Sequence, residues 1–117
     1  MTTASKMVLS GSTNGRPIKV AATATPGTLL HTATSTSGQL DEVWLWVCNT
    51  DNATRKLTVE WGGTTAPDDL IEVSIPAESG LVLVAPGLLV AGGLVVRAFA
   101  AAANVVTVVG HVHRISP

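Results

Sequence analysis

Apolar and polar residues alternate in short segments along most of the chain. In the segment IEVSI, for example, Ile71, Val73 and Ile75 alternate with two polar residues. This period of two is typical of a β-strand that buries one face. Turn-forming pairs such as Pro26-Gly27 separate the segments, and no stretch has the periodicity of a helix. The pattern therefore predicts an all-β protein.

Each alternating segment between turn signals is predicted to be one strand. The expected strands are Pro17–Thr23, Thr28–Thr34, Gln39–Cys48, Arg55–Trp61, Leu70–Ile75, Leu81–Val84, Leu88–Val90 with Leu94–Ala100, and Val105–Ile115. About eight short, regularly spaced strands favour an antiparallel β-sandwich, of which the jelly roll is one form.

The first residues differ from the rest of the chain. Residues 1–16 are rich in Ser, Thr and Gly, and they contain the turn signal Asn14-Gly15. We predict an N-terminal arm or a loose hairpin over residues 1–16. Residues 17–117 are then a single β-sandwich domain, a length within the usual range for one domain.

The segment Val43–Val47 is apolar at every position, because Trp44 and Trp46 occupy the places where polar residues would alternate. A two-sheet sandwich buries only the inner face of each sheet, so the second face of this strand needs a cover. Charged residues are only 13% of the chain, against about 25% in typical domains. We therefore expect association with other subunits; the alternative is that loops or the N-terminal arm cover the second face.

Composition excludes several classes of function. The net charge of −1 comes with scattered Lys and Arg, so we expect no nucleic-acid partner. Cys48 is the only cysteine, so no intrachain disulfide can form. The uncharged stretch after Glu78 is interrupted by Pro86-Gly87, which favours strands and a turn over a membrane helix. We expect a soluble chain that does not enter a membrane.

His111 and His113 are the sharpest chemical signal in the chain. One residue apart in a strand, they share a face with Cα atoms about 6.6–6.8 Å apart, which suits two ligands of one metal. A zinc site needs a third protein ligand, and no acidic residue follows Glu78; His31 or Glu72 are the distant candidates. We therefore predict that both histidines are exposed or lie at an interface, and that the protein binds no metal. His111 and His113 are the only residues that we consider as candidate metal ligands.

Catalytic patterns are missing from the sequence. It contains no Gly-x-Ser-x-Gly elbow and no phosphate-binding loop. Asp41 and Glu42 are neighbours, so in a strand they point to opposite faces and are expected at a solvated edge rather than in an acid/base pair. We predict that the protein is not an enzyme and has neither a cofactor nor a small-molecule substrate.

Three stretches in the second half of the chain follow one another in a recognisable order: LTVEWGG, then IPAESG, then GLLVAGGLVVRAFA. Together with the apolar strand before them, over residues 42–115, they resemble a broad group of small structural proteins from tailed-bacteriophage particles. The resemblance implies a capsid decoration (cement) protein, a homotrimer that binds the major capsid protein on the virion surface. Before assembly it would reside in the host cytoplasm.

Two alternatives stay open at this point. One is a tail or head–tail connector component, and the other is a carbohydrate- or metal-binding β-sandwich module. For the decoration protein we expect the arm to lie across a neighbouring subunit. The expected interface residues are Lys6, Val8 and Arg16 in the arm, and Trp44 and Trp46 in the two-sided apolar strand.

Overall fold

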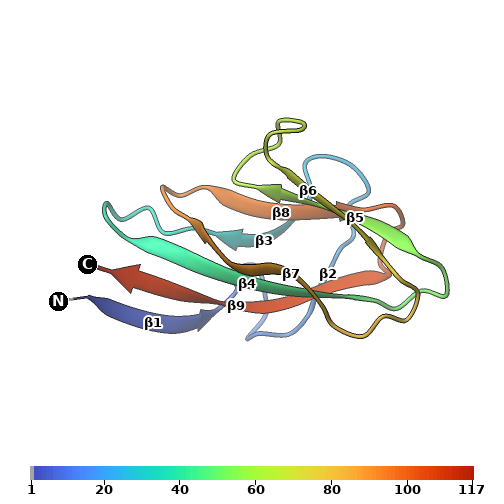
Figure 1. Ribbon diagram of the computed structural model, residues 1–117, viewed down its shortest axis with the longest axis horizontal. Helices are drawn as coiled ribbons and strands as arrows, with labels where there is room; N and C mark the ends of the chain where they lie inside the picture. Colours follow the sequence, from blue (N-terminus) through green and yellow to red (C-terminus); the bar gives the residue numbers. More distant parts are fainter. Residues whose placement is uncertain (1) are drawn as a thin grey trace.

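The computed structural model describes residues 2–117, which form nine β-strands and no helix (Figure 1). The strands are β1 (Thr3–Val8), β2 (Ile18–Lys19), β3 (Thr28–Thr32), β4 (Leu40–Asn49), β5 (Arg55–Trp61), β6 (Leu70–Ile75), β7 (Val82–Val90), β8 (Val95–Ala100) and β9 (Val106–Ser116). The first and last strands lie side by side, because β1 pairs with β9 from Thr3 opposite Ser116 onward.

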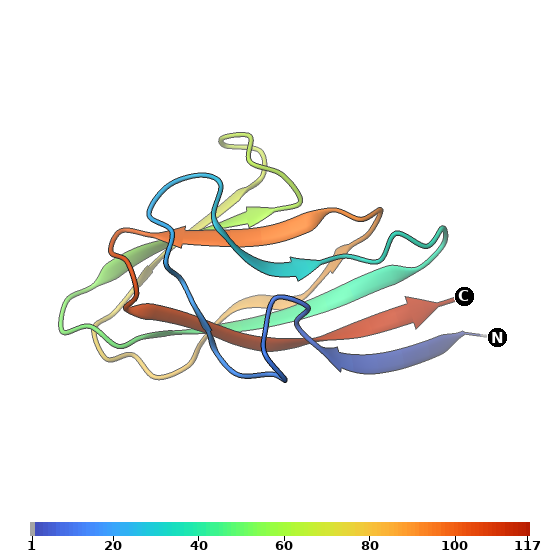
Figure 2. The same cartoon turned by 180° about the vertical axis from the view of Figure 1, so that it is seen from behind.

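The strands form two antiparallel sheets that pack face to face (Figures 1 and 2). Sheet A has the order β1-β9-β4-β7, with β2 also paired to β9, and sheet B has the order β3-β8-β5-β6. The pairs β2·β9, β3·β8, β4·β7 and β5·β6 are nested, as if one long hairpin had been rolled up. This is the strand order of a jelly roll. The predicted all-β sandwich is confirmed, with one strand more than expected.

β7 runs without a break through Pro86-Gly87, where the sequence predicted a turn between two strands. Two register shifts against β4 accommodate these residues, one between Val43 and Trp44 and one between Leu45 and Trp46. Proline is tolerated there because β7 is an edge strand of sheet A, so the missing N–H breaks no ladder. The proline and the bulges also keep this edge from pairing with another chain.

The segment expected to be an arm or a loose hairpin contributes two structural features. Residues 3–8 form β1 and extend sheet A beyond β9. Leu9, which follows β1, is 1% exposed and belongs to the hydrophobic core. The backbone N–H of Gly11 then donates to the carbonyl of Leu30 beside β3. The first residues therefore lie at the edge of sheet A and do not cover its outer face.

The core lies between the two sheets and is built from the inward-facing half of each strand. In β4, buried and half-buried residues alternate along almost the whole strand, as the period of two requires. The buried aliphatic and alanine side chains are Leu9, Ile18, Val20, Leu30, Ala33, Val43, Leu45, Val47, Leu57, Val59, Ile75, Ala85, Val90, Val96, Ala98, Ala100, Val106, Val108 and Val112.

The outer face of sheet B is partly covered by the loop between β2 and β3. Glu60 points to this face from β5, yet it is 1% exposed. Its carboxylate accepts hydrogen bonds from the Thr25 hydroxyl at 2.5 Å and from the Gly27 N–H at 2.6 Å. The two outer faces are thus unlike: one is covered by a loop, whereas that of sheet A stays open.

Candidate functional site: the outer face of sheet A

The outer face of sheet A is organised in rows that cross its strands. The strand register aligns each outward side chain with a neighbour on the next strand. We call the following residues the sheet A face: a charged row of Lys6, His113, Glu42 and Leu89; an aromatic row of Val8, His111, Trp44 and Pro86; and an apolar row of Val109, Trp46 and Leu83.

Three aromatic rings form the centre of this face. The ring centroids of Trp44, Trp46 and His111 lie 5.7–6.2 Å from one another, and the rings are within 30° of parallel. The Trp44 indole also lies over Gly87, where a Cβ would come within 2.9 Å of the ring. Contacts on both sides therefore hold the Trp44 ring in one orientation.

Glu42 links the charged row to the aromatic row. Its Oε1 accepts a hydrogen bond from the Trp44 Nε1–H at 2.9 Å and lies 3.1 Å from Nδ1 of His113. The hydrogen bond from Trp44, followed by that from His113, lowers the pKa of Glu42, so this carboxylate is ionised at neutral pH. The face thus carries a fixed negative charge beside its aromatic centre.

Exposed apolar side chains are concentrated on this side of the molecule. Seven large hydrophobic residues are exposed among residues 2–117. Val8, Leu83 and Leu89 belong to the sheet A face, and Leu40 continues it along β4. Contiguous apolar surface of this kind marks a site of interaction with another molecule.

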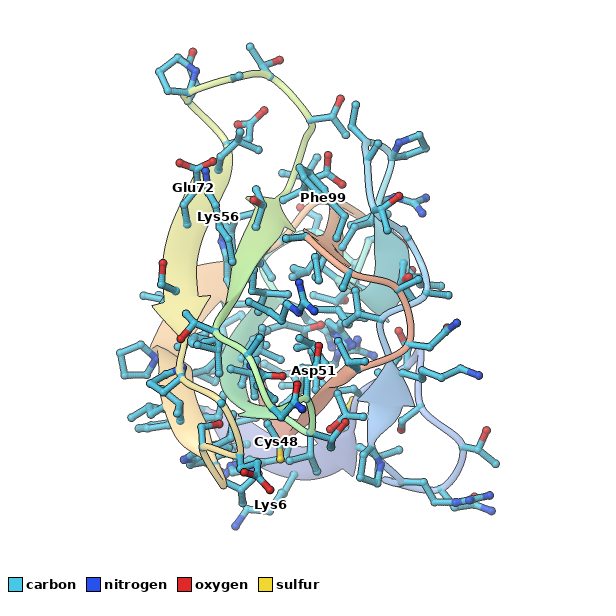
Figure 3. All side chains as sticks on the ribbon, turned by 90° about the vertical axis from the view of Figure 1, so that its right-hand side faces the viewer. Lys6, Cys48, Asp51, Lys56, Glu72 and Phe99 are labelled. Carbon is cyan, nitrogen blue, oxygen red and sulfur yellow. The ribbon has the colours of Figure 1, made fainter. Side chains whose placement is uncertain are left out.

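The structure brings together four of the five predicted interface residues. Lys6, Val8, Trp44 and Trp46 all lie on the sheet A face. Figure 3 shows Lys6 on the side of sheet A, opposite Lys56 and Glu72 on sheet B. Arg16 is separate: it lies between β1 and β2 and lines an open hollow of about 310 Å³.

His111 and His113 do share one face of β9, and their ring centroids are 5.3 Å apart. The two suggested third ligands are not beside them. His31 is in the core and 1% exposed, whereas Glu72 forms an ion pair with Lys56 at 3.0 Å on sheet B. Residues 2–117 contain no group of three or more His, Cys, Asp or Glu side chains placed to hold a metal ion.

Asp41 and Glu42 point to opposite faces, as predicted, but the expectation that Asp41 is solvated was wrong. Asp41 is 0% exposed. Its Oδ2 accepts hydrogen bonds from His31 Nε2 at 2.8 Å and from the Thr34 N–H at 3.0 Å. Arg114 donates to both carboxylate oxygens, at 2.8 and 2.9 Å. Four hydrogen bonds from three residues replace those to water that burial removes.

Ser10, His31 and Asp41 are the residue types of a hydrolase triad, but their hydrogen bonds differ from those of a triad. The main-chain N–H of Ser10 donates to Nδ1 of His31 at 3.1 Å. Nδ1 therefore carries no proton, and Nε2–H donates to Asp41. The Ser10 hydroxyl accepts from the Thr32 N–H at 2.7 Å, so it is not directed at the imidazole as a nucleophile would be. The network connects β3, β4, β9 and the segment after β1.

Comparison with known proteins does not place the chain in a family. No protein-family model matches it, and no curated protein or solved structure is significantly similar to it. Within residues 2–117 there is no helix long and apolar enough to cross a membrane. The function therefore has to be inferred from the sheet A face itself.

The electrostatics of this face can be tested through His111. Burial lowers the pKa of His111, and the charges of Lys6 and His113 lower it further, whereas Glu42 opposes them. We expect Lys6→Met to raise the pKa of His111 and Glu42→Gln to lower it, as followed by NMR titration of the imidazole C–H signals. Lys19→Met is the control, because Lys19 lies opposite Thr107, farther along β9. An unchanged pKa in Lys6→Met would contradict this account.

Proposed function

We propose that this protein is a non-enzymatic structural component of a tailed-phage particle, a decoration protein that binds the shell of major capsid protein. The observation that carries the proposal is the sheet A face, a solvent-facing surface of half-buried aromatic and exposed aliphatic side chains that spans all the long strands of one sheet. When another protein covers such a face, the free energy of the system falls by about 25 cal/mol per Å² of apolar surface removed from water. A decoration protein uses this kind of surface for protein–protein contact.

The stretches over residues 42–115 resemble small phage structural proteins. By analogy of fold, jelly rolls are common in viral capsid domains, and lectins and cupins share them. Many copies attached to one shell also multiply modest affinities. On this proposal the protein resides on the virion surface, and in the host cytoplasm before assembly.

Val8→Glu is expected to weaken binding to particles at least about tenfold, because a buried, unpaired carboxylate would face the partner. Co-sedimentation of the purified chain with particles that lack it measures the affinity. Leu94→Glu is a matched control: Leu94 is 50% exposed against 48% for Val8, and it lies in the turn between β7 and β8, off the sheet A face. Equal binding by the two variants would refute a docking role for this face.

Antibody labelling of particles from the phage that encodes the chain tests the location. Label spread over the head supports a decoration protein. Label confined to the tail or neck would contradict it and favour a tail or connector component.

A carbohydrate-binding module is the second candidate. The near-parallel rings of Trp44, Trp46 and His111 on an exposed face favour it, since aromatic faces are apolar and pack on flat apolar surfaces. Binding on a glycan array that Trp46→Ala abolishes would establish this candidate. No binding to any glycan would remove it.

A further inference from the structure

We propose that the sheet A face docks on the same face of a second copy of this chain, across a two-fold axis that runs parallel to β9 and β4 and midway between them. The inference rests on the proposed function in one respect, that the sheet A face is a protein-docking surface. It adds that the free chain covers this face with a second copy, as a two-fold dimer in place of the trimer that the resemblance implies. The dimer must open before the same face binds a particle.

A rotation by 180° about this axis places each row of the sheet A face opposite the same row of the second copy. The rotation exchanges β9 with β4 and β1 with β7, and it keeps each row at the same height along the strands. His113 then faces Glu42 of the second copy, and His111 faces Trp44 of the second copy. In the next row, Val109 faces Trp46 of the second copy. Aromatic and apolar side chains of one copy thus face aromatic and apolar side chains of the other.

Charge favours the same arrangement. The basic side chains lie on the β1 and β9 half of the charged row, as Lys6 and His113, whereas the carboxylate of Glu42 lies on the β4 half. The axis places His113 opposite Glu42 of the second copy, and Lys6 opposite Leu89 of the second copy, one strand away from that carboxylate. An axis at right angles to the strands would place Glu42 over Trp46 of the second copy, where the carboxylate would be desolvated without gaining a polar partner from that copy. Self-complementarity therefore selects the axis along the strands.

The face is large enough for such a contact. Four strands about 4.8 Å apart, each with about nine residues at about 3.3 Å, span a flat area of roughly 600 Å². Upright side chains make the accessible area larger than this projection, which brings it near the roughly 800 Å² that each partner buries in a standard interface. The central Trp44 is already held by Glu42 and Gly87, so little side-chain freedom is lost on docking.

The first test is the mass of the purified full chain in solution, measured by light scattering across the micromolar range. We expect a dimer, twice the chain mass of 12.0 kDa. Glu42→Lys and His113→Glu should each weaken it at least about tenfold. His113→Glu places two carboxylates in contact across the axis, and Glu42→Lys removes the acceptor that faces His113 and buries a lysine without a counter-charge. Glu72→Lys, on the exposed outer side of sheet B, should leave the dimer intact.

Mixing the two weakened variants is the decisive experiment. In a mixed pair, the introduced lysine of one chain faces the introduced glutamate of the other, while the remaining His113 and Glu42 face each other as in the unmodified dimer. We therefore expect dimers to reappear on mixing, seen by native mass spectrometry as a species containing one chain of each kind.

Other results would overturn the inference. A monomer at all concentrations excludes the second copy as the partner, and a trimer, or a mixture that forms no dimers, excludes the two-fold pairing. These outcomes are separate from failure of the proposed function, because a monomer that binds particles through Val8 would still be a decoration protein. A dimer that binds no particle would instead keep this inference and remove the proposed function.

Discussion

Asp41→Asn is expected to destabilise the fold by about 3 kcal/mol, the lower end of the range for breaking a buried ion pair. The buried carboxylate is paired with Arg114 through both oxygens and also accepts from His31 and Thr34. Asparagine keeps one acceptor oxygen, but its NH₂ group faces the donors of Arg114 and leaves the guanidinium without its counter-charge. Urea denaturation of the variant and the unmodified chain measures the loss.

Asp51→Asn is the matched control. Asp51 pairs with Arg55 at 2.6 Å, but both side chains are partly exposed and lie close together in sequence. Pairs of this kind contribute about 0–1 kcal/mol. If Asp41→Asn costs no more than Asp51→Asn, the buried network does not stabilise the fold as proposed.

Acid should destabilise the unmodified protein by protonating the same carboxylate. Burial alone would raise the pKa of Asp41, but the hydrogen bonds from Arg114, His31 and Thr34 outweigh it and hold the pKa at about 2, against 3.8 for a free aspartate. A lowered pKa stabilises the fold above the unfolded-state value, and this contribution is lost as pH falls from about 4 to about 2. It amounts to about 2 kcal/mol. Asp41→Asn should abolish this part of the acid dependence.

Gly110→Ala is expected to cost about 3 kcal/mol or more, the upper part of the range for forced overpacking. Gly110 lies opposite Leu45 in the middle of the β9–β4 pairing. A Cβ there would overlap the backbone carbonyl oxygen of Trp44. Because that oxygen belongs to the backbone of a central strand, it cannot turn aside as a side chain would. β9 and β4 would have to separate, and ladder hydrogen bonds would be lost.

Gly80→Asn serves as the control for Gly110→Ala. Gly80 has φ +66°, a conformation that asparagine accepts, and nothing lies within 4 Å of a Cβ built there. We expect little change in the denaturation midpoint. A Gly110→Ala variant as stable as the unmodified chain would show that β9 and β4 approach each other less closely than described.

The local pattern predicted much of the strand content. The bounds of β5 and β6 were predicted to the residue, because alternation was regular and clear turn signals flanked each strand. Alternation also placed Trp44 with Trp46, and His111 with His113, each pair on one face. β1 was missed because its residues are mostly exposed and polar, so it carries no apolar period of its own. Its pairing with β9 makes it a strand.

The candidate site was predictable only in part. Asp41 alternates with Val43 and Leu45, and this pattern is the sequence signal that it faces the core. By itself, the sequence determined which side chains share a face of one strand, since that follows from the period of two. Only the tertiary structure decided that Lys6, His113 and Glu42 form one row and that Arg114 reaches Asp41. These contacts join residues some seventy or more positions apart, and the strand register that creates them depends on the packing of the whole sandwich.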